Sequence, residues 1–278
     1  MYYNILTQKD HPKYRTVKKT LKLLVEFVEA DCIYFSDSAV ESKIGILTVV
    51  VSKKSPHYYD DVVFHLWKVI ENYNTFSFCF FDKECIKREV GKGNLFFLFN
   101  CKETDLVYRN TGGKPVLDIK KINMKRLLKK TFANYQMWIA EANTIGRDLK
   151  YHRGNENHLM ALYVINEQFR YFFINASWIL TGEWVADGNI ADQQERIAKF
   201  NNVLGNTFDL DNKEEKEVLR KLDLARKAVQ WGEEIEPLTA EIVESAYTKV
   251  KWLMNEVKTM YQQYAEQTKQ IFKEYGNQ

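Results

Sequence analysis

Six lysine and arginine side chains lie close together between residues 120 and 130. Three of them, Lys121, Lys125 and Lys129, are spaced four residues apart, so a helix would place them along one face. A row of ammonium groups with this spacing can hold successive phosphates of a nucleic acid. The alternative is an ordinary solvated helix face, because charged side chains are mostly exposed to water. This segment is our candidate phosphate-binding site.

The other residue types that commonly support catalysis lack a suitable spacing. The four cysteines all lie within the first 101 residues and form no Cys-x-x-Cys or interleaved histidine pattern, so we expect them to be buried core residues. His152 and His158 are six residues apart, which is a poor spacing for binding one metal ion from a helix. The chain has no P-loop, Rossmann glycine motif, nucleophile elbow or His-Glu-x-x-His motif. We therefore expect no metal and no cofactor.

The composition indicates a folded and mainly helical protein. Apolar residues make up 45% of the 278 residues, whereas glycine and proline together number only 16. The formal net charge is +3, so any attraction for nucleic acid must come from a local surface. The N-terminus lacks a signal-peptide pattern, and every apolar run is too short to span a bilayer. We expect a cytoplasmic protein that does not bind membranes.

The hydrophobic pattern changes at residues 110–115, where two adjacent glycines are closely followed by a proline. We place a domain boundary here, with one domain over residues 1–113 and another over residues 114–278. In the first, helical patterns alternate with short β-branched and aromatic runs, which predicts an α/β domain with a mixed sheet. Its expected helices are residues 17–28, 58–73 and 83–90, and its expected strands are residues 32–36, 44–51 and 76–81. Residues 95–99 and 105–108 are expected to be further extended or buried segments.

Residues 114–278 have helical periodicity throughout, which predicts a bundle of five helices. We expect Leu128, Phe132, Tyr135, Ile139 and Ile145 to mark the apolar face of the first helix. Residues 162–179 carry the second, which ends at Gly182, and residues 190–204 the third. Asp211 is the expected N-cap of the fourth helix. A fifth helix begins near Pro237 and Thr239, with its apolar face over residues 242–260.

Residues 35–50 read Phe-Ser-Asp-Ser-Ala-Val-Glu-Ser-Lys-Ile-Gly-Ile-Leu-Thr-Val-Val and resemble the catalytic strand pair of nucleotidyltransferases. That family has a Gly-Ser turn and then an Asp-x-Asp motif, whose two carboxylates hold metal ions. This chain has Ser36-Asp37 and Lys43-Ile44-Gly45 at the corresponding places. A lysine and a glycine cannot coordinate Mg²⁺. The resemblance therefore implies a degenerate nucleotidyltransferase-like domain, with Lys43 and Gly45 at the sheet positions of the metal-binding carboxylates.

Residues 118–260 resemble the HEPN superfamily, whose helical bundles occur beside or fused to nucleotidyltransferases in prokaryotes. The resemblance rests on the long first helix and on two later stretches. Residues 165–182 read Ile-Asn-Glu-Gln-Phe-Arg-Tyr-Phe-Phe-Ile-Asn-Ala-Ser-Trp-Ile-Leu-Thr-Gly. Residues 222–231 read Leu-Asp-Leu-Ala-Arg-Lys-Ala-Val-Gln-Trp. The resemblance implies a HEPN-like all-α bundle, and it implies that the protein forms a homodimer.

Active HEPN ribonucleases carry an Arg-x(4–6)-His motif, in which histidine acts as acid or base on the RNA 2′-hydroxyl and arginine stabilises charge on phosphate. This chain contains Arg153-Gly-Asn-Glu-Asn-His158, so the resemblance makes Arg153 and His158 the catalytic candidates. In the family the motif lies late in the bundle, where this chain has Arg226 without a following histidine. A surface turn with a histidine at a helix start is the alternative interpretation.

Taken together, these patterns predict an α+β protein that acts as a non-catalytic nucleotide- or RNA-binding, or regulatory, protein of the nucleotidyltransferase–HEPN type. One alternative is a metal-independent endoribonuclease that uses Arg153 and His158. Another is a structural interaction protein without a nucleotide ligand. If the chain is an enzyme, we expect a ribonuclease or a nucleotidyltransferase. The expected partners are a nucleotide or RNA and a second copy of the chain.

Overall fold

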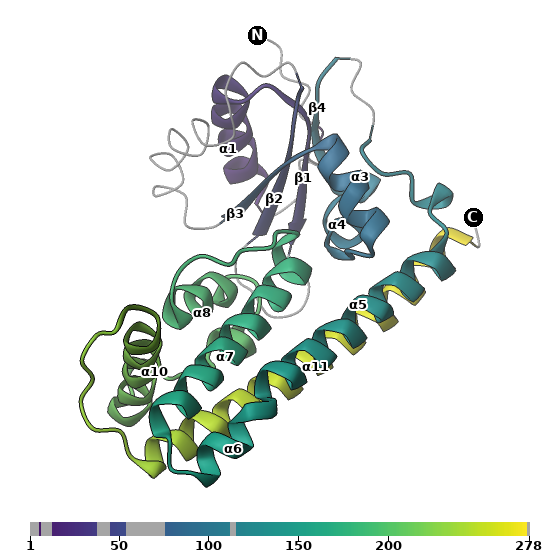
Figure 1. The fold of residues 1–278 in the computed structure, drawn as a ribbon. Coiled ribbons are helices and arrows are strands. Elements are labelled where there is room, and N and C mark those ends of the chain that lie inside the picture. The colour runs from purple at the N-terminus through teal and green to yellow at the C-terminus, as the bar shows by residue number, and fades with distance from the viewer. Residues whose placement is uncertain (1–5, 7–12, 38–44, 54–75, 112–114, 277–278) are drawn as a thin grey trace. The chain divides into compact units, whose positions relative to one another are not determined.

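The computed structural model describes residues 6, 13–37, 45–53, 76–111 and 115–276. The protein is a mixed α+β structure whose chain divides into two compact units (Figure 1). One unit comprises residues 1–130 and 268–278, and the other comprises residues 131–267. The predicted boundary after residue 113 adjoins residues outside the described ranges and stays a prediction.

The first unit is built on a four-stranded sheet with the strand order β3-β2-β1-β4. Its strands are β1 (Ala30–Asp37), β2 (Gly45–Val51), β3 (Phe76–Asp82) and β4 (Leu106–Arg109). β1 pairs antiparallel with both β2 and β4, whereas β2 and β3 are parallel. The prediction of a mixed sheet is therefore confirmed. The helix predicted over residues 58–73 falls outside the described residues.

Helices cover both faces of this sheet, as Figure 1 shows. On one face, α1 (Tyr14–Phe27) packs Val17, Leu21 and Leu24 against residues of β1, β2 and β3. On the other face lie α3 (Lys83–Lys92) and α4 (Phe96–Asn100), where the Phe97 ring is 4.9 Å from that of Phe81. The burial of these aromatic and aliphatic side chains supplies the main stabilisation of the first unit.

Residues 95–98 are buried, as one of the two predicted alternatives required, but the segment is not extended, because Phe96–Asn100 forms the single-turn helix α4. Two amide side chains favour the helical turn. Asn94 accepts a hydrogen bond from the Phe96 N–H, and Asn100 donates one to the Phe96 carbonyl. A short run of buried apolar residues has the same pattern in a strand as in a helix, so periodicity could not distinguish them.

The second unit is helical throughout its described residues. Its elements are α5 (Met124–Ile145), the 3₁₀ turn η3 (Gly146–Asp148), α6 (Leu149–Gly154), α7 (His158–Thr181), α8 (Ile190–Ala198), α9 (Asn202–Gly205), α10 (Lys213–Trp231) and α11 (Ala240–Gly276). The first residues of α5 and the last residues of α11 belong to the first unit. α7 is the central element, with fifteen buried residues and contacts to α6, α8 and α10. Its predicted apolar face is confirmed from Leu162 to Ile179.

Three details of the predicted bundle are wrong. The third helix is divided into α8 and α9, because Asn201 caps a new helix by accepting a hydrogen bond from the Leu204 N–H. The N-cap of α10 is Asn212, which accepts from two backbone N–H groups, and not Asp211. The buried face of α5 carries Trp138 and Ala142, whereas the Phe132 side chain predicted there is 57% exposed.

Candidate functional site

The candidate phosphate-binding segment forms the start of α5 in the first unit. The 3₁₀ turn η2 (Ile119–Lys121) precedes the helix, and Asn123 caps it by accepting a hydrogen bond from the Arg126 N–H. α5 has no acidic residue in its first turn. The positive end of the helix dipole therefore lies beside several side chains of the same charge, an arrangement that costs stability and favours a bound anion.

The predicted row of three lysines on one helix face is only partly correct. Lys125 and Lys129 are exposed on α5, but Lys121 belongs to η2, because the helix begins later than the spacing suggested. Lys121 also forms an ion pair of 2.9 Å with Asp118, and its hydrogen bond lowers the pKa of that carboxyl. Lys121 is therefore partly neutralised, whereas Lys125 and Lys129 have no ion-pair partner among the described residues.

Two further cations complete the surface around Lys125 and Lys129. Lys120 and Arg126 are exposed, and within the described ranges neither forms an ion pair. We call the four unpaired side chains of Lys120, Lys125, Arg126 and Lys129 the basic surface. It concentrates four positive charges on a chain whose net charge is only +3.

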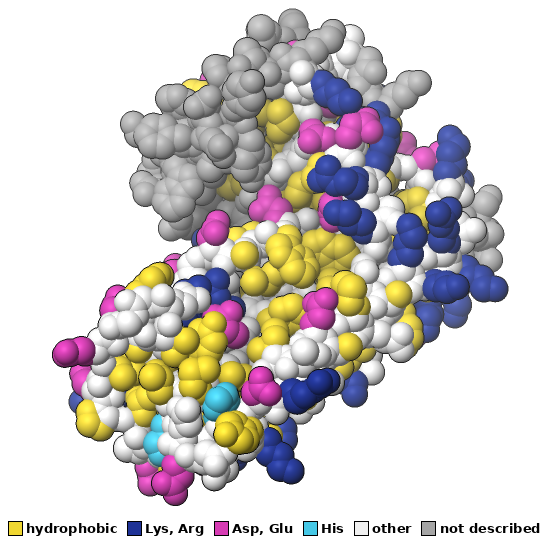
Figure 2. Space-filling model, viewed as in Figure 1, with side chains coloured by type: hydrophobic (Ala, Val, Ile, Leu, Met, Phe, Trp, Pro, Cys, Tyr) yellow, Lys and Arg dark blue, Asp and Glu magenta, His cyan; other side chains and the backbone are white. Residues whose placement is uncertain are grey.

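The exposed side of α3 lies close to the basic surface. The sequence analysis did not identify this neighbouring helix. Lys130 donates a hydrogen bond from its ammonium group to the Gly91 carbonyl, which ties the first turns of α5 to the end of α3. Figure 2 shows lysine and arginine side chains gathered over α3 and the N-terminal part of α5. The exposed cations of α3, Lys87, Arg88 and Lys92, each pair with Glu84 or Glu89. The helical spacing of Lys87, Arg88 and Lys92 in the sequence was the signal that could have identified α3 as a second helix with exposed cations.

The proposed catalytic pair lies in the second unit, at the turn between α6 and α7. Arg153 is directed toward α11. Its Nε lies 3.0 Å from Glu244 Oε1, its Nη2 donates to the same oxygen, and its guanidinium carbon lies 4.1 Å from the centroid of the Tyr247 ring. This contact with carboxylate and ring fixes the guanidinium and neutralises its charge.

His158 is the first residue of α7, where its backbone N–H donates to the Glu156 carbonyl. Within the described part of the chain, no hydrogen bond or ion pair joins Arg153 to His158. Arg153 has its partners on α11, and the catalytic role of the two residues stays a prediction.

The strand pair that resembles the nucleotidyltransferase hairpin is described only in part. Lys43 and Ile44 lie outside the described residues, whereas Gly45 is the first residue of β2, paired with Asp37 and Phe76. A Cβ atom at Gly45 would lie 2.4 Å from a ring atom of Phe35. Glycine is required here because the rings of Phe35 and Phe76 pack closely around it.

The described residues contain no helix that is both long and apolar enough to cross a membrane. Comparison of the chain with protein-family models, with curated proteins and with solved structures finds no match.

Proposed function

We propose that this chain is a non-catalytic RNA-binding protein of the nucleotidyltransferase–HEPN type, which holds RNA phosphates on the basic surface of its first unit. The observation that carries the proposal is the set of four exposed cations without ion-pair partners among the described residues, one in η2 and three at the N-terminal end of α5. Lys125 and Lys129 lie four residues apart, close enough along the helix to contact neighbouring phosphates. RNA as the partner comes from the resemblance to HEPN proteins.

The local electrostatics support binding over an ordinary solvated face. Surface cations that only increase solubility are usually interspersed with acidic residues, whereas Asp118 is the sole acidic residue between residues 118 and 130. Like charges at i and i+4 repel one another, and cations at the positive end of a helix dipole add to that cost. An RNA phosphate removes both penalties.

The endoribonuclease alternative requires Arg153 to reach a phosphate. The ion pair with Glu244 and the stacking on Tyr247 compete with that role, so the binding function is the better supported of the two. The homodimer and the cytoplasmic location are part of the same proposal.

The proposal is tested by replacing Lys125 and Lys129 with glutamine, which keeps the helix propensity and removes two charges. We expect the affinity for a single-stranded RNA to fall about 25-fold in 100 mM salt, because each lost phosphate contact on a single strand contributes about 0.7 to the logarithmic salt dependence. Fluorescence anisotropy with a labelled oligonucleotide measures this change. Relief of charge repulsion should leave the melting temperature unchanged or raise it.

Lys213→Gln together with Lys216→Gln provides the matched control, because these exposed lysines on α10 remove the same net charge from a different surface. We expect this variant to bind RNA as the unmodified protein does. Equal loss of affinity in both variants would mean that only the net charge matters, and would contradict a defined surface on α5.

A further inference from the structure

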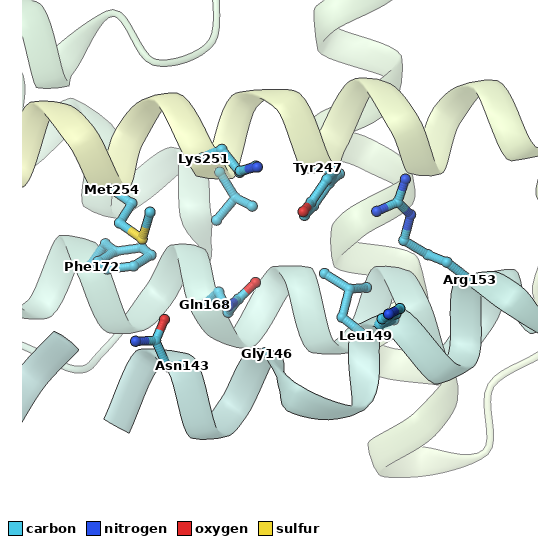
Figure 3. A pocket seen from close by; sticks show the side chains of 11 residues that line it. Asn143, Gly146, Leu149, Arg153, Gln168, Phe172, Tyr247, Lys251 and Met254 are labelled. Carbon is cyan, nitrogen blue, oxygen red and sulfur yellow. The ribbon is translucent and has the colours of Figure 1, made fainter. Parts of the chain in front are cut away.

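A cavity of about 410 Å³ lies within the second unit, between the C-terminal end of α5, α6, α7 and α11 (Figure 3). Its volume lies within the range of small-molecule binding sites. Leu149, Phe172, Val250 and Met254 supply its apolar wall. Phe172 and Val250 are buried, so this wall is part of the packed core and presents a fixed surface.

The charged residues that line the cavity are all positive. Lys150 and Lys251 are exposed at its edge, and neither has an ion-pair partner among the described residues. Arg153 is the third cation, but its charge is neutralised by Glu244. The cavity therefore carries two uncompensated positive charges beside an apolar wall, which favours an organic anion over a neutral or cationic ligand.

Tyr247 is fixed where the charged and apolar parts of the cavity meet. Arg153 lies over its ring at 4.1 Å, and the ammonium of Lys251 lies 5.1 Å from the ring centroid. Figure 3 shows the hydroxyl end of Tyr247 pointing between α11 and α7, toward the cavity. This hydroxyl forms no hydrogen bond with another described residue, so it is available to a ligand.

Gln168 presents a hydrogen-bond acceptor from the opposite wall. Its Nε2 donates to the Ala142 carbonyl at 3.2 Å and lies so close to Gly146 that a Cβ there would be 2.3 Å away. The donor end of this amide is therefore occupied, whereas its Oε1 has no partner among the described residues. A ligand that donates an N–H at this point satisfies the free oxygen.

We propose that this cavity binds a nucleoside monophosphate, a ligand class that joins an apolar base with an amino group to a phosphate. Lys150 and Lys251 hold the phosphate, the half-buried side chain of Met254 beside the buried apolar wall receives the base, and Gln168 Oε1 accepts a hydrogen bond from its exocyclic amine. The Gln168 amide is fixed by its hydrogen bond to Ala142, whereas the two lysines are exposed side chains that can turn toward the phosphate. The site is independent of the basic surface on α5.

The proposal is tested by isothermal titration of the full-length chain with AMP, with IMP, which lacks the exocyclic amine, and with inorganic phosphate. We expect saturable binding of AMP and at least tenfold weaker binding of IMP and of phosphate. Lys150→Gln together with Lys251→Gln is expected to weaken AMP binding at least tenfold. The Lys213→Gln and Lys216→Gln control should bind AMP with unchanged affinity.

Absence of AMP binding at millimolar concentration would overturn the proposal, as would equal binding of AMP and phosphate. Unchanged AMP affinity in the Lys150 and Lys251 variant would also overturn it. The Lys125 and Lys129 variant should bind AMP normally, and the Lys150 and Lys251 variant should bind single-stranded RNA normally. Failure at this cavity is therefore distinguishable from failure of the proposed RNA-binding function.

Discussion

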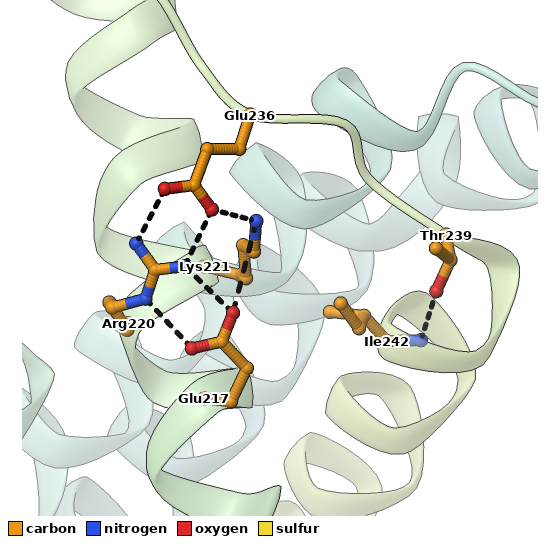
Figure 4. A network of polar contacts seen from close by, with 6 residues as sticks. All are labelled: Glu217, Arg220, Lys221, Glu236, Thr239 and Ile242. Carbon is orange, nitrogen blue, oxygen red and sulfur yellow. Dashed lines mark hydrogen bonds and ion pairs between the residues drawn. The ribbon is translucent and has the colours of Figure 1, made fainter.

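Replacement of Glu217 and Glu236 together by alanine is expected to lower the free energy of unfolding by roughly 3 kcal/mol, because it leaves the ammonium group of Lys221 buried without an opposite charge. Lys221 is only 5% exposed, and its Nζ lies 2.7 Å from Glu236 Oε2 and 3.8 Å from Glu217 Oε1. Arg220 bridges the same carboxylates at 2.7 Å (Figure 4). These contacts fix the segment that connects α10 to α11.

Chemical denaturation of this variant and two relatives measures the effect. Adding Lys221→Met to the double variant should recover most of the lost stability, because the new side chain is apolar and of similar length. Arg220→Gln alone should cost much less stability than the double variant, since it removes only exposed ion pairs. A double variant as stable as the unmodified protein would show that Lys221 does not depend on these carboxylates.

The same network makes the protein sensitive to acid. Hydrogen bonds from Arg220 and Lys221 lower the pKa of Glu236 to about 2, and Arg220 also lowers that of Glu217. A carboxyl group whose pKa is lowered in the folded state stabilises the protein fully at pH values above its unfolded-state pKa, near 4.5. This stabilisation is lost as the pH falls from there toward 2. The melting temperature should fall over this interval more steeply for the unmodified protein than for the double variant.

Gly205→Ala is expected to destabilise the second unit by roughly 2–3 kcal/mol, because the added methyl group overpacks a site with no free space. Gly205 is the buried last residue of α9, and a Cβ there would lie 2.3 Å from Ala198 Cα and 2.4 Å from Ala198 Cβ. Ala198 ends α8, so the clash is with backbone that cannot rotate away. Urea unfolding measures the loss.

Gly154 provides the matched control, since it is also the last residue of a short helix, α6, and has no atom within 4 Å of a Cβ position. Gly154→Ala should leave stability unchanged or raise it by up to about 1 kcal/mol, because alanine loses less conformational entropy on folding. Equal destabilisation by the two substitutions would contradict the close packing of α8 against α9.

The sequence predicted the elements whose hydrophobic pattern is long and regular. The apolar residues of α7 from Leu162 to Ile179 are all buried as expected, because six positions at helical spacing define one face. α5 was less predictable, since apolar residues occur on more than one of its faces and Phe132 is exposed while Trp138 is buried. Periodicity identifies a helix in such a segment but not the face that packs.

The sites depended on contacts that no local pattern contains. Arg153 pairs with Glu244, which lies 91 residues further along the chain, so its neutralisation could not be read from the Arg-x4-His spacing. The cavity gathers residues from Asn143 to Met254 on five separate elements, α5, η3, α6, α7 and α11. The cations of α5 were visible in the sequence, but whether each one is paired or free depended on the bounds of η2 and α5.

The salt dependence of RNA binding tests the central claim, that four unpaired cations on the first unit hold RNA phosphates. With four contacts to a single strand, the affinity should fall about 50-fold between 50 and 200 mM salt, and in the Lys125 and Lys129 variant only about sevenfold. Anisotropy titrations of both proteins at several salt concentrations give these values directly. An affinity that does not change with salt, or the same dependence in both proteins, would contradict the account.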